Sequence, residues 1–90
     1  MTLAKNEDAA RYELRVDGVL VGLADYAEQG DVVVIPHTET APAYGGRGLA
    51  SRLVRYALDD VRATGRRVDP ACPFVAVFIQ RNPEYADLLN

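Results

Sequence analysis

The chain has 90 residues, of which 49% are hydrophobic and 26% charged, and its formal net charge is 10 − 13 = −3. Two separate cores would each be too small to outweigh the loss of chain entropy, so we expect one domain over residues 1–90. Residues 1–9 carry no strand or helix signal, which leaves disorder open for them. The apolar share argues against a disordered chain, and no apolar run approaches the ~20 residues that span a bilayer.

The cysteine count and the first residues indicate a compartment. Cys72 is the only cysteine, which excludes an intramolecular disulfide framework and a cysteine-rich zinc site, and one histidine adds no metal site. The stretch from Met1 to Asp8 has no apolar segment after Lys5, so we expect no signal peptide. By elimination, the sequence predicts a cytoplasmic protein without a bound metal.

Charge is distributed unevenly along the chain. Residues 1–40 carry eight acidic side chains against three basic ones, whereas residues 41–67 carry six arginines against two acids. General nucleic-acid binding needs a broad basic face, so we expect neither a nucleic-acid nor a membrane partner, and a small polyanion suits this segment better. Arg55 and Arg62 flank Asp59 at helical spacing, and we interpret these two as a solvated helix face.

The first half of the chain predicts an antiparallel meander. Arg11–Val16 alternates apolar and charged residues, and Asp17-Gly18 after it is a strong hairpin signal. Val19–Tyr26 continues as a second strand up to a turn at Gln29–Asp31. Val32–Ile35 is an apolar run, which predicts a central strand covered on both faces. Residues 37–41 are either a loop or a further extended segment.

Helices are predicted in the second half. Pro42–Gly46 reads as a loop, and from Gly48 apolar residues recur at helical spacing until Gly65 ends the helix. A short strand at Arg66–Asp69 follows. Pro73 suits the first position of a helix over Phe74–Gln80, although a strand also fits, and a terminal helical turn follows near Tyr85. The fold class is therefore α+β.

A glycine-rich stretch from Gly45 to Ser51 opens the first predicted helix. Glycines let backbone N–H groups converge, and the first turn of a helix adds unpaired N–H groups with a positive dipole end. This pattern suits a phosphate or pyrophosphate, although a tight strand-to-helix turn alone would also use it. It matches neither a Walker loop nor the G-x-G-x-x-G dinucleotide pattern.

The chain resembles the GNAT superfamily of N-acetyltransferases, whose acetyl-CoA motif is Q/R-x-x-G-x-G/A between a strand and a helix. Gly48 and Ala50 match this motif, while Gly45 stands where the family has Gln or Arg. The resemblance is closest to a small single-domain subfamily, marked by His37-Thr38-Glu39, Cys72-Pro73-Phe74-Val75 and Arg81-Asn82-Pro83-Glu84-Tyr85. It implies a GNAT-like α+β fold with residues 37–41 as strand.

This resemblance also implies a binding site for acetyl-CoA as co-substrate. The amides of the stretch from Gly45 to Ser51 would bind the pyrophosphate, helped by the charges of Arg47 and Arg52. Thr40 and Ala41 would pair with the pantetheine amides, and Asn82 is a further candidate for the pantetheine arm. The expected cofactor-binding residues are Thr40, Ala41, Gly45, Gly46, Arg47, Gly48, Leu49, Ala50, Ser51, Arg52 and Asn82.

Three residues are candidates for acyl-transfer chemistry. Glu39 and His37 are two positions apart, so an extended segment would point both to one side, where either could act as the base for the amine. Cys72 follows a strand and precedes a helix, and we weigh three roles for it: a nucleophile, the acid that protonates the departing thiolate, and a core residue.

The sequence thus predicts an acetyl-CoA-dependent N-acetyltransferase that acts on an amine of an unknown small molecule or protein. The alternatives are a non-catalytic acyl-CoA-binding module and a structural or interaction domain with a degenerate loop. An exposed edge strand could pair with a second copy, so we expect a monomer or a weak homodimer.

Overall fold

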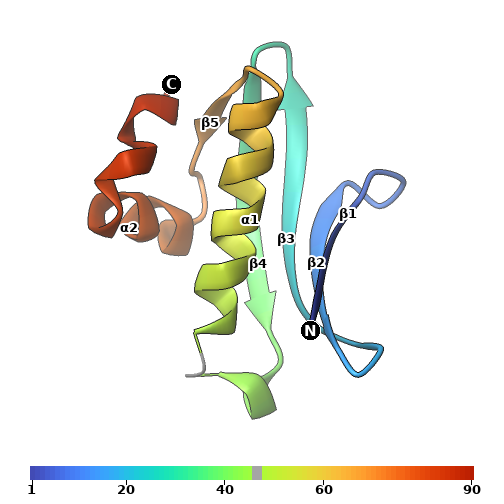
Figure 1. Cartoon of the computed structure of the whole chain (residues 1–90). Helices are drawn as coiled ribbons and strands as arrows, with labels where there is room; N and C mark the ends of the chain where they lie inside the picture. Colours follow the sequence, from blue (N-terminus) through green and yellow to red (C-terminus); the bar gives the residue numbers. More distant parts are fainter. Residues whose placement is uncertain (46–47) are drawn as a thin grey trace.

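A computed structural model describes residues 1–45 and 48–90 of the chain, as a five-stranded sheet with helices (Figure 1). The strands are β1 (Thr2–Asn6), β2 (Arg11–Val16), β3 (Val19–Gln29), β4 (Val32–Thr40) and β5 (Arg67–Asp69). Between and after them lie the 3-10 helix η1 (Pro42–Tyr44), the helices α1 (Leu49–Ala63) and α2 (Pro73–Arg81), and the 3-10 helix η2 (Pro83–Leu88). The α+β class predicted from the sequence is confirmed.

The strands lie in chain order across the sheet. Neighbours from β1 to β4 are antiparallel, and β5 is parallel to β4. Asp17 and Gly18 join β2 to β3 with φ angles of 51° and 80°, the positive values that a two-residue hairpin turn requires. Helix α1 supplies the crossover that a parallel pair needs between β4 and β5.

Strand β1 is an element that the sequence did not predict. Its five residues pair with β2 along their whole length, and Leu3 packs against the core. Lys5 adds an ion pair to Asp60 of α1, with 3.0 Å between Nζ and Oδ2. Residues 1–9, whose order was left open, therefore contain an edge strand that is held by pairing rather than by its own sequence preference.

Helix α1 crosses one face of the sheet and buries the apolar stripe that the sequence predicted (Figure 1). It packs against β2, β3, β4 and β5, while α2 contacts α1 beyond β5. The buried residues of α1 are Leu53, Val54, Ala57, Leu58 and Val61.

The sequence predicted that the segment Val32–Ile35 is covered on both faces, and this expectation is wrong. Val33 and Ile35 are buried under α1, but Val32 and Val34 on the other side of β4 remain half-buried. The strand is also longer than the four apolar residues suggested, because residues 37–40 continue it. The face of the sheet away from α1, called the open face below, therefore carries charged side chains next to apolar ones.

None of the helices in the described residues is long and apolar enough to cross a bilayer.

Candidate functional site

A bulge in β4 decides which way the candidate catalytic residues point. The register pairs Asp25 with His37 and Ala27 with Val34, so one residue of β3 faces two residues of β4, Ile35 and Pro36. Because side chains alternate along a strand, one extra residue reverses the face of everything that follows it. Past the bulge, even-numbered residues of β4 point to the α1 side, and odd-numbered ones point to the open face.

Cross-strand partners confirm this reversal. Thr38 pairs with Ala24, which is fully buried in the core, whereas Glu39 pairs with Leu23 on the opposite face. Directly paired residues share a face of the sheet. Thr38 and Thr40 therefore lie on the α1 side, and His37 and Glu39 lie on the open face.

His37 and Glu39 form an exposed pair on the open face. The distance from Nε2 of His37 to Oε1 of Glu39 is 3.2 Å, and the two side chains are 53% and 61% exposed. Their separation by two positions on a strand places them side by side, as the spacing predicted. An imidazole nitrogen or a carboxylate that is open to solvent on one side can accept the proton of an incoming ammonium group and pass it to water.

Cys72 lies on the other side of β4, at the start of α2. It is the N-cap residue of this helix and is only 7% exposed. Its amide donates to the carbonyl of Ile35 at 2.8 Å, and its Sγ lies 3.5 Å from Oγ1 of Thr38. These two bonds hold the cysteine against β4 at the point where β5 has already ended.

The surroundings of the thiol favour its ionised form. Burial raises the pKa of Cys72, but hydrogen bonds from the Thr38 hydroxyl and from the backbone of Val75, Phe74 and Thr38 outweigh burial. The pKa of this thiol therefore lies below its ordinary value. A helix N-terminus with free amides next to a buried thiol is a common way to obtain such a shift.

The first turn of α1 has amides that no carbonyl of the helix can accept from. Gly48 is the N-cap residue with a left-handed φ of 73°, and no side chain caps the helix. The first-turn amides of Leu49, Ala50 and Ser51 have no partner within the helix. Gly48 adopts this φ without the steric cost that a Cβ would bring.

Some of the expected binding residues add no free backbone amide near the start of α1. The amide of Gly45 donates to the carbonyl of Pro42 at 3.2 Å and that of Ala41 to the carbonyl of Val21 at 2.8 Å, so neither amide is free for a ligand. The expected contacts of Gly46 and Arg47 lie outside the described residues. Thr40 pairs with Gly22 of β3.

Arg52 points away from α2. Its Nη1 lies 3.8 Å from the sulfur of Met1, at the start of β1 on the other side of α1 (Figure 1). A contact of this guanidinium with a group held between the two helices would need a different rotamer.

A groove of ≈ 610 Å³ runs between α1 and α2. Asn82 lies at its wall, donates from Nδ2 to the carbonyl of Phe78 at 2.8 Å and accepts from Nη2 of Arg55 at 3.0 Å. Phe74 and Val77 are both 41% exposed and give the groove apolar walls. The groove is lined by Ser51, Arg55, Pro73, Phe74, Val77, Phe78, Arg81 and Asn82.

Arg55 is an exposed helix residue, as the sequence predicted, with 45% of its side chain accessible, but it also contacts α2 and η2. Its guanidinium stacks over the rings of Phe78 and Tyr85 at 5.4 Å from each centroid, and it donates to Tyr85 at 3.2 Å. It therefore joins α1 to α2 and η2 and forms part of the groove wall. The arginine-rich stretch itself was a sequence signal for this role, but the hydrogen-bond partners Asn82 and Tyr85 lie 27 and 30 positions away.

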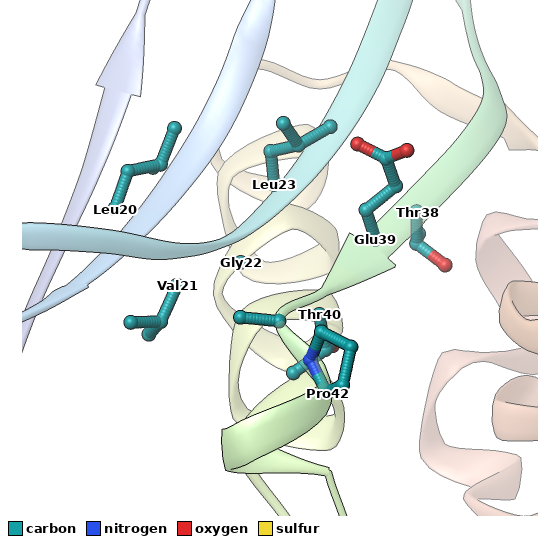
Figure 2. Close-up of a pocket in the computed structure, with 9 residues that line it drawn as sticks. Leu20, Val21, Gly22, Leu23, Thr38, Glu39, Thr40 and Pro42 are labelled. Atoms are coloured by element: carbon teal, nitrogen blue, oxygen red, sulfur yellow. The ribbon is translucent and has the colours of Figure 1, made fainter.

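A second pocket, of ≈ 640 Å³, lies at the end of β4 (Figure 2). Leu20, Leu23 and Glu39 point to the same side of their strands there (Figure 2). Thr38, Thr40, Ala41 and Pro42 complete the β4 side of the pocket. Of the expected site residues, Glu39, Thr40 and Ala41 thus line this pocket, while Ser51 and Asn82 line the groove.

In the described part of the chain, no three His, Cys, Asp or Glu side chains are grouped so that they could hold a metal ion.

Comparison with known proteins finds a family model that matches most of the chain. The model of a family described as GCN5-related N-acetyl-transferase matches residues 11–88. Protein NATD1 of Bos taurus is 38% identical over 52 residues, which are 58% of this chain and 46% of that protein. The matched segment thus spans about half the length of the curated relatives.

Solved structures share the fold. A GCN5-like protein from Staphylococcus aureus superimposes with a TM-score of 0.76 at 15% identity, covering 99% of this chain and 87% of that one. An aminoglycoside N-acetyltransferase solved in complex with CoA gives a TM-score of 0.56 at 20% identity, covering 83% of this chain and 64% of that one. At such identities the similarity concerns the fold alone.

Proposed function

Because the chain belongs to the GCN5-related N-acetyl-transferase family, we propose that it transfers the acetyl group of acetyl-CoA to an amine of a small molecule or protein. The observation that carries this proposal is the family match over residues 11–88. The family match does not favour the alternative of a non-catalytic CoA-binding module.

The groove between α1 and α2 suits acetyl-CoA by size and chemistry. Its volume of ≈ 610 Å³ lies in the range of small-molecule sites, and it combines the apolar surfaces of Phe74 and Val77 with the charges of Arg55 and Arg81. The uncapped first turn of α1 begins next to it, since Ser51 belongs to both. We assign the pyrophosphate to the amides of Leu49, Ala50 and Ser51, where the helix dipole favours an anion.

Pantetheine would follow β4 toward Cys72. Beyond Ile35, whose carbonyl accepts from the amide of Cys72, none of the described strands pairs with this edge of β4, which leaves it for main-chain pairing with a ligand. The amide of Ala41 points to β3, and because successive N–H groups alternate, that of Thr40 points to the free edge. We therefore propose the amide of Thr40 as a pantetheine ligand, and Asn82 as a second one because it lines the groove.

Two roles for Cys72 fit its lowered pKa. As an acid, the thiol donates its proton to the sulfur of CoA as the thioester bond breaks, and it regains one from water. As a nucleophile, its thiolate takes the acetyl group first and passes it to the amine. Glu39 with His37 removes the proton of the ammonium in either case.

The one free cysteine and a CoA thioester as co-substrate support a cytoplasmic location.

Binding and turnover test this proposal separately. Calorimetry with acetyl-CoA should give one site, and Gly48→Ala should weaken this binding, because a Cβ at a φ of 73° is strained although no described residue outside its chain neighbours lies within 4 Å of it. Gly65→Ala, at the C-terminal end of α1 with a φ of 74°, is the matched control for strain without a ligand contact.

Turnover is measured as acetylated product over a panel of amines, with Cys72→Ala and Glu39→Gln as variants. Product formation that falls in both variants with unchanged acetyl-CoA affinity supports the enzyme. Binding without product in the wild type and both variants would leave a CoA-binding module instead. An acetyl adduct on Cys72, seen in the intact mass and absent in Cys72→Ala, would select the nucleophile over the acid.

A further inference from the structure

The pocket at the end of β4 has a chemistry of its own. Among the described residues that line it, Glu39 is the only ionisable one. On the open face its walls include the side chains of Leu20 and Leu23, whereas Thr38 and Thr40, which also line it, turn their side chains to the α1 side. Leu20 and Leu23 are half-buried, so their remaining surface faces the pocket side of the sheet.

The carboxylate is placed at one border of the apolar surface. Glu39 is 61% exposed and points to the same side as Leu20 and Leu23 (Figure 2). Its cross-strand partner is Leu23, so an anion and a leucine lie directly side by side. A ligand that fills this pocket meets a negative charge at one end and hydrocarbon at the other.

Thr38 connects this pocket to the thiol. It lines the pocket, and its hydroxyl lies 3.5 Å from Sγ of Cys72. Glu39 on the open face and Cys72 on the α1 side therefore lie on either side of β4, close to the part of its edge that β5 does not cover.

We propose that this pocket receives the acceptor, and that it selects a small primary monoamine whose ammonium group is carried on an apolar alkyl or aryl group, without a neighbouring carboxylate or phosphate. This inference rests on the proposed acetyltransferase function and adds the class of the acceptor. The ammonium pairs with Glu39, and the hydrocarbon covers Leu20 and Leu23. A carboxylate next to the ammonium would lie against Glu39, where like charges repel.

In this arrangement, every proton and electron pair of the acetyl transfer is accounted for. The ammonium first gives one proton to the pair of Glu39 and His37, which releases it to water. The amine nitrogen then forms a C–N bond to the acetyl carbon, and the C–S bond breaks with its electron pair going to sulfur. The nitrogen loses its second proton, and the CoA sulfur gains one from the thiol of Cys72, which is restored from solvent. The products are a neutral amide, free CoA and one proton in solution.

Matched acceptors test the class directly. Phenylethylamine and 3-methylbutylamine are compared with L-phenylalanine and L-leucine, which differ from them only by the carboxylate. We expect kcat/KM for each monoamine to exceed that of its amino acid by at least about tenfold, the size of effect that like-charge repulsion gives. Equal or better acetylation of the amino acids, or of a lysine-containing peptide, would overturn the inference and leave the proposed function in place.

Two variants separate recognition from catalysis. Glu39→Gln should lower the preference for the monoamine over the amino acid, because it removes the repelled charge, whereas loss of a base alone would lower both rates equally. Leu23→Ser should lower kcat/KM for phenylethylamine with little change for methylamine. Asp31→Asn, an exposed acid in the turn between β3 and β4, is the control that should keep the preference unchanged. A preference that Glu39→Gln leaves intact contradicts the inference.

NMR measures binding of the amine to the pocket independently of turnover. Phenylethylamine added to the labelled protein should shift the methyl signals of Leu20 and Leu23, and L-phenylalanine should not. Such shifts without any acetylated product would support the ligand class of the pocket while the proposed function fails. Shifts elsewhere, or none, would overturn the inference.

Discussion

At the scale of single residues, the environment of Cys72 is the most informative feature. A buried thiol ordinarily has a raised pKa, and here hydrogen bonds from Thr38 and from the start of α2 reverse that direction. Thr38 can point to the thiol only because the bulge in β4 turns it to the α1 side. The reactivity of Cys72 therefore depends on a backbone irregularity two and three residues before Thr38.

Replacing Thr38 tests this dependence. Thr38→Val keeps the shape of the side chain but removes the hydroxyl, so the pKa of Cys72 should rise and its reaction with iodoacetamide at neutral pH should slow several-fold. The pH titration of the thiolate ultraviolet absorbance measures the pKa directly. Thr40→Val on the same face of β4 is the matched control and should leave the titration unchanged. A titration that is also unchanged in Thr38→Val would mean that the backbone amides alone set the pKa.

A second residue-scale feature is the nearly buried Glu13 on the open face. Its carboxylate accepts from Nε of Arg11 at 2.6 Å, from Nδ2 of Asn6 at 3.2 Å and from Nη2 of Arg15 at 3.3 Å. The hydrogen bond from Arg11 is the largest cause that keeps the pKa of Glu13 below its ordinary value, against the opposing effect of burial.

This lowered pKa makes the stabilisation by Glu13 depend on pH. A group with a lower pKa in the folded state stabilises it above the unfolded pKa of about 4.3, and this contribution is lost as the pH falls through the folded value. Glu13→Gln should therefore reduce the free energy of unfolding by about 1–2 kcal/mol at neutral pH and by much less in acid. Urea unfolding at both pH values measures it, with the exposed Glu7→Gln as control. A loss of equal size at both pH values would show that the effect is not electrostatic.

At the scale of elements, local signals decided what the sequence could predict. The Asp17-Gly18 hairpin, the helix α1 with its end at Gly65, and the Pro73 start of α2 all follow from residues within a few positions of each other. Strand β1 has no such signal, because its order comes from pairing with β2 and from Lys5 on Asp60. It could not be predicted without knowing its partners.

The same limit applies to the candidate site. The pairing of His37 with Glu39 follows from their spacing on a strand, which the sequence shows. Their separation from Cys72 by the sheet itself depends on the bulge, which is defined only by the register with β3. The contacts of Arg55 with Asn82 and Tyr85 likewise join segments far apart in the chain.

The element η2 gives an element-scale prediction. Arg62 of α1 holds it with two hydrogen bonds to the Asp87 carboxylate, at 2.8 and 2.9 Å, and one to the carbonyl of Glu84 at 2.8 Å. Arg62→Ala should therefore speed hydrogen exchange several-fold at the amides of Tyr85 and Leu89, through local opening, and leave the amides of β2 and β3 unchanged.

Arg66→Ala is the matched control for this experiment. Arg66 pairs with Glu28 of β3, so its loss should not affect η2. Uniform acceleration over the whole chain in Arg62→Ala would instead mean that η2 unfolds only together with the core.

At the scale of the whole molecule, one core joins nearly all elements. Buried residues from β2, β3, β4, α1, β5, α2 and η2 form a single cluster, and the radius of gyration of 12.3 Å matches the about 12 Å that a compact chain of this length has. We therefore propose that residues 1–90 unfold as one cooperative unit, which is what a single domain requires. Far-ultraviolet circular dichroism and tyrosine fluorescence should give coincident thermal transitions.

Acetyl-CoA links this cooperative unit to the proposed function. A ligand that binds only the folded state at a hundredfold excess over Kd stabilises it by about 2.7 kcal/mol, and for a domain of this size about 1 kcal/mol moves Tm by about 4–8 °C. The protein should therefore melt about 10–20 °C higher with saturating acetyl-CoA. Gly48→Ala should lose most of that shift. Without ligand it should still melt in one transition, because Phe78, which lines the groove, belongs to the same core as the sheet. Separate transitions for the sheet and for α2 with η2 would contradict the single unit, since a ligand held between α1 and α2 would then stabilise only one of them.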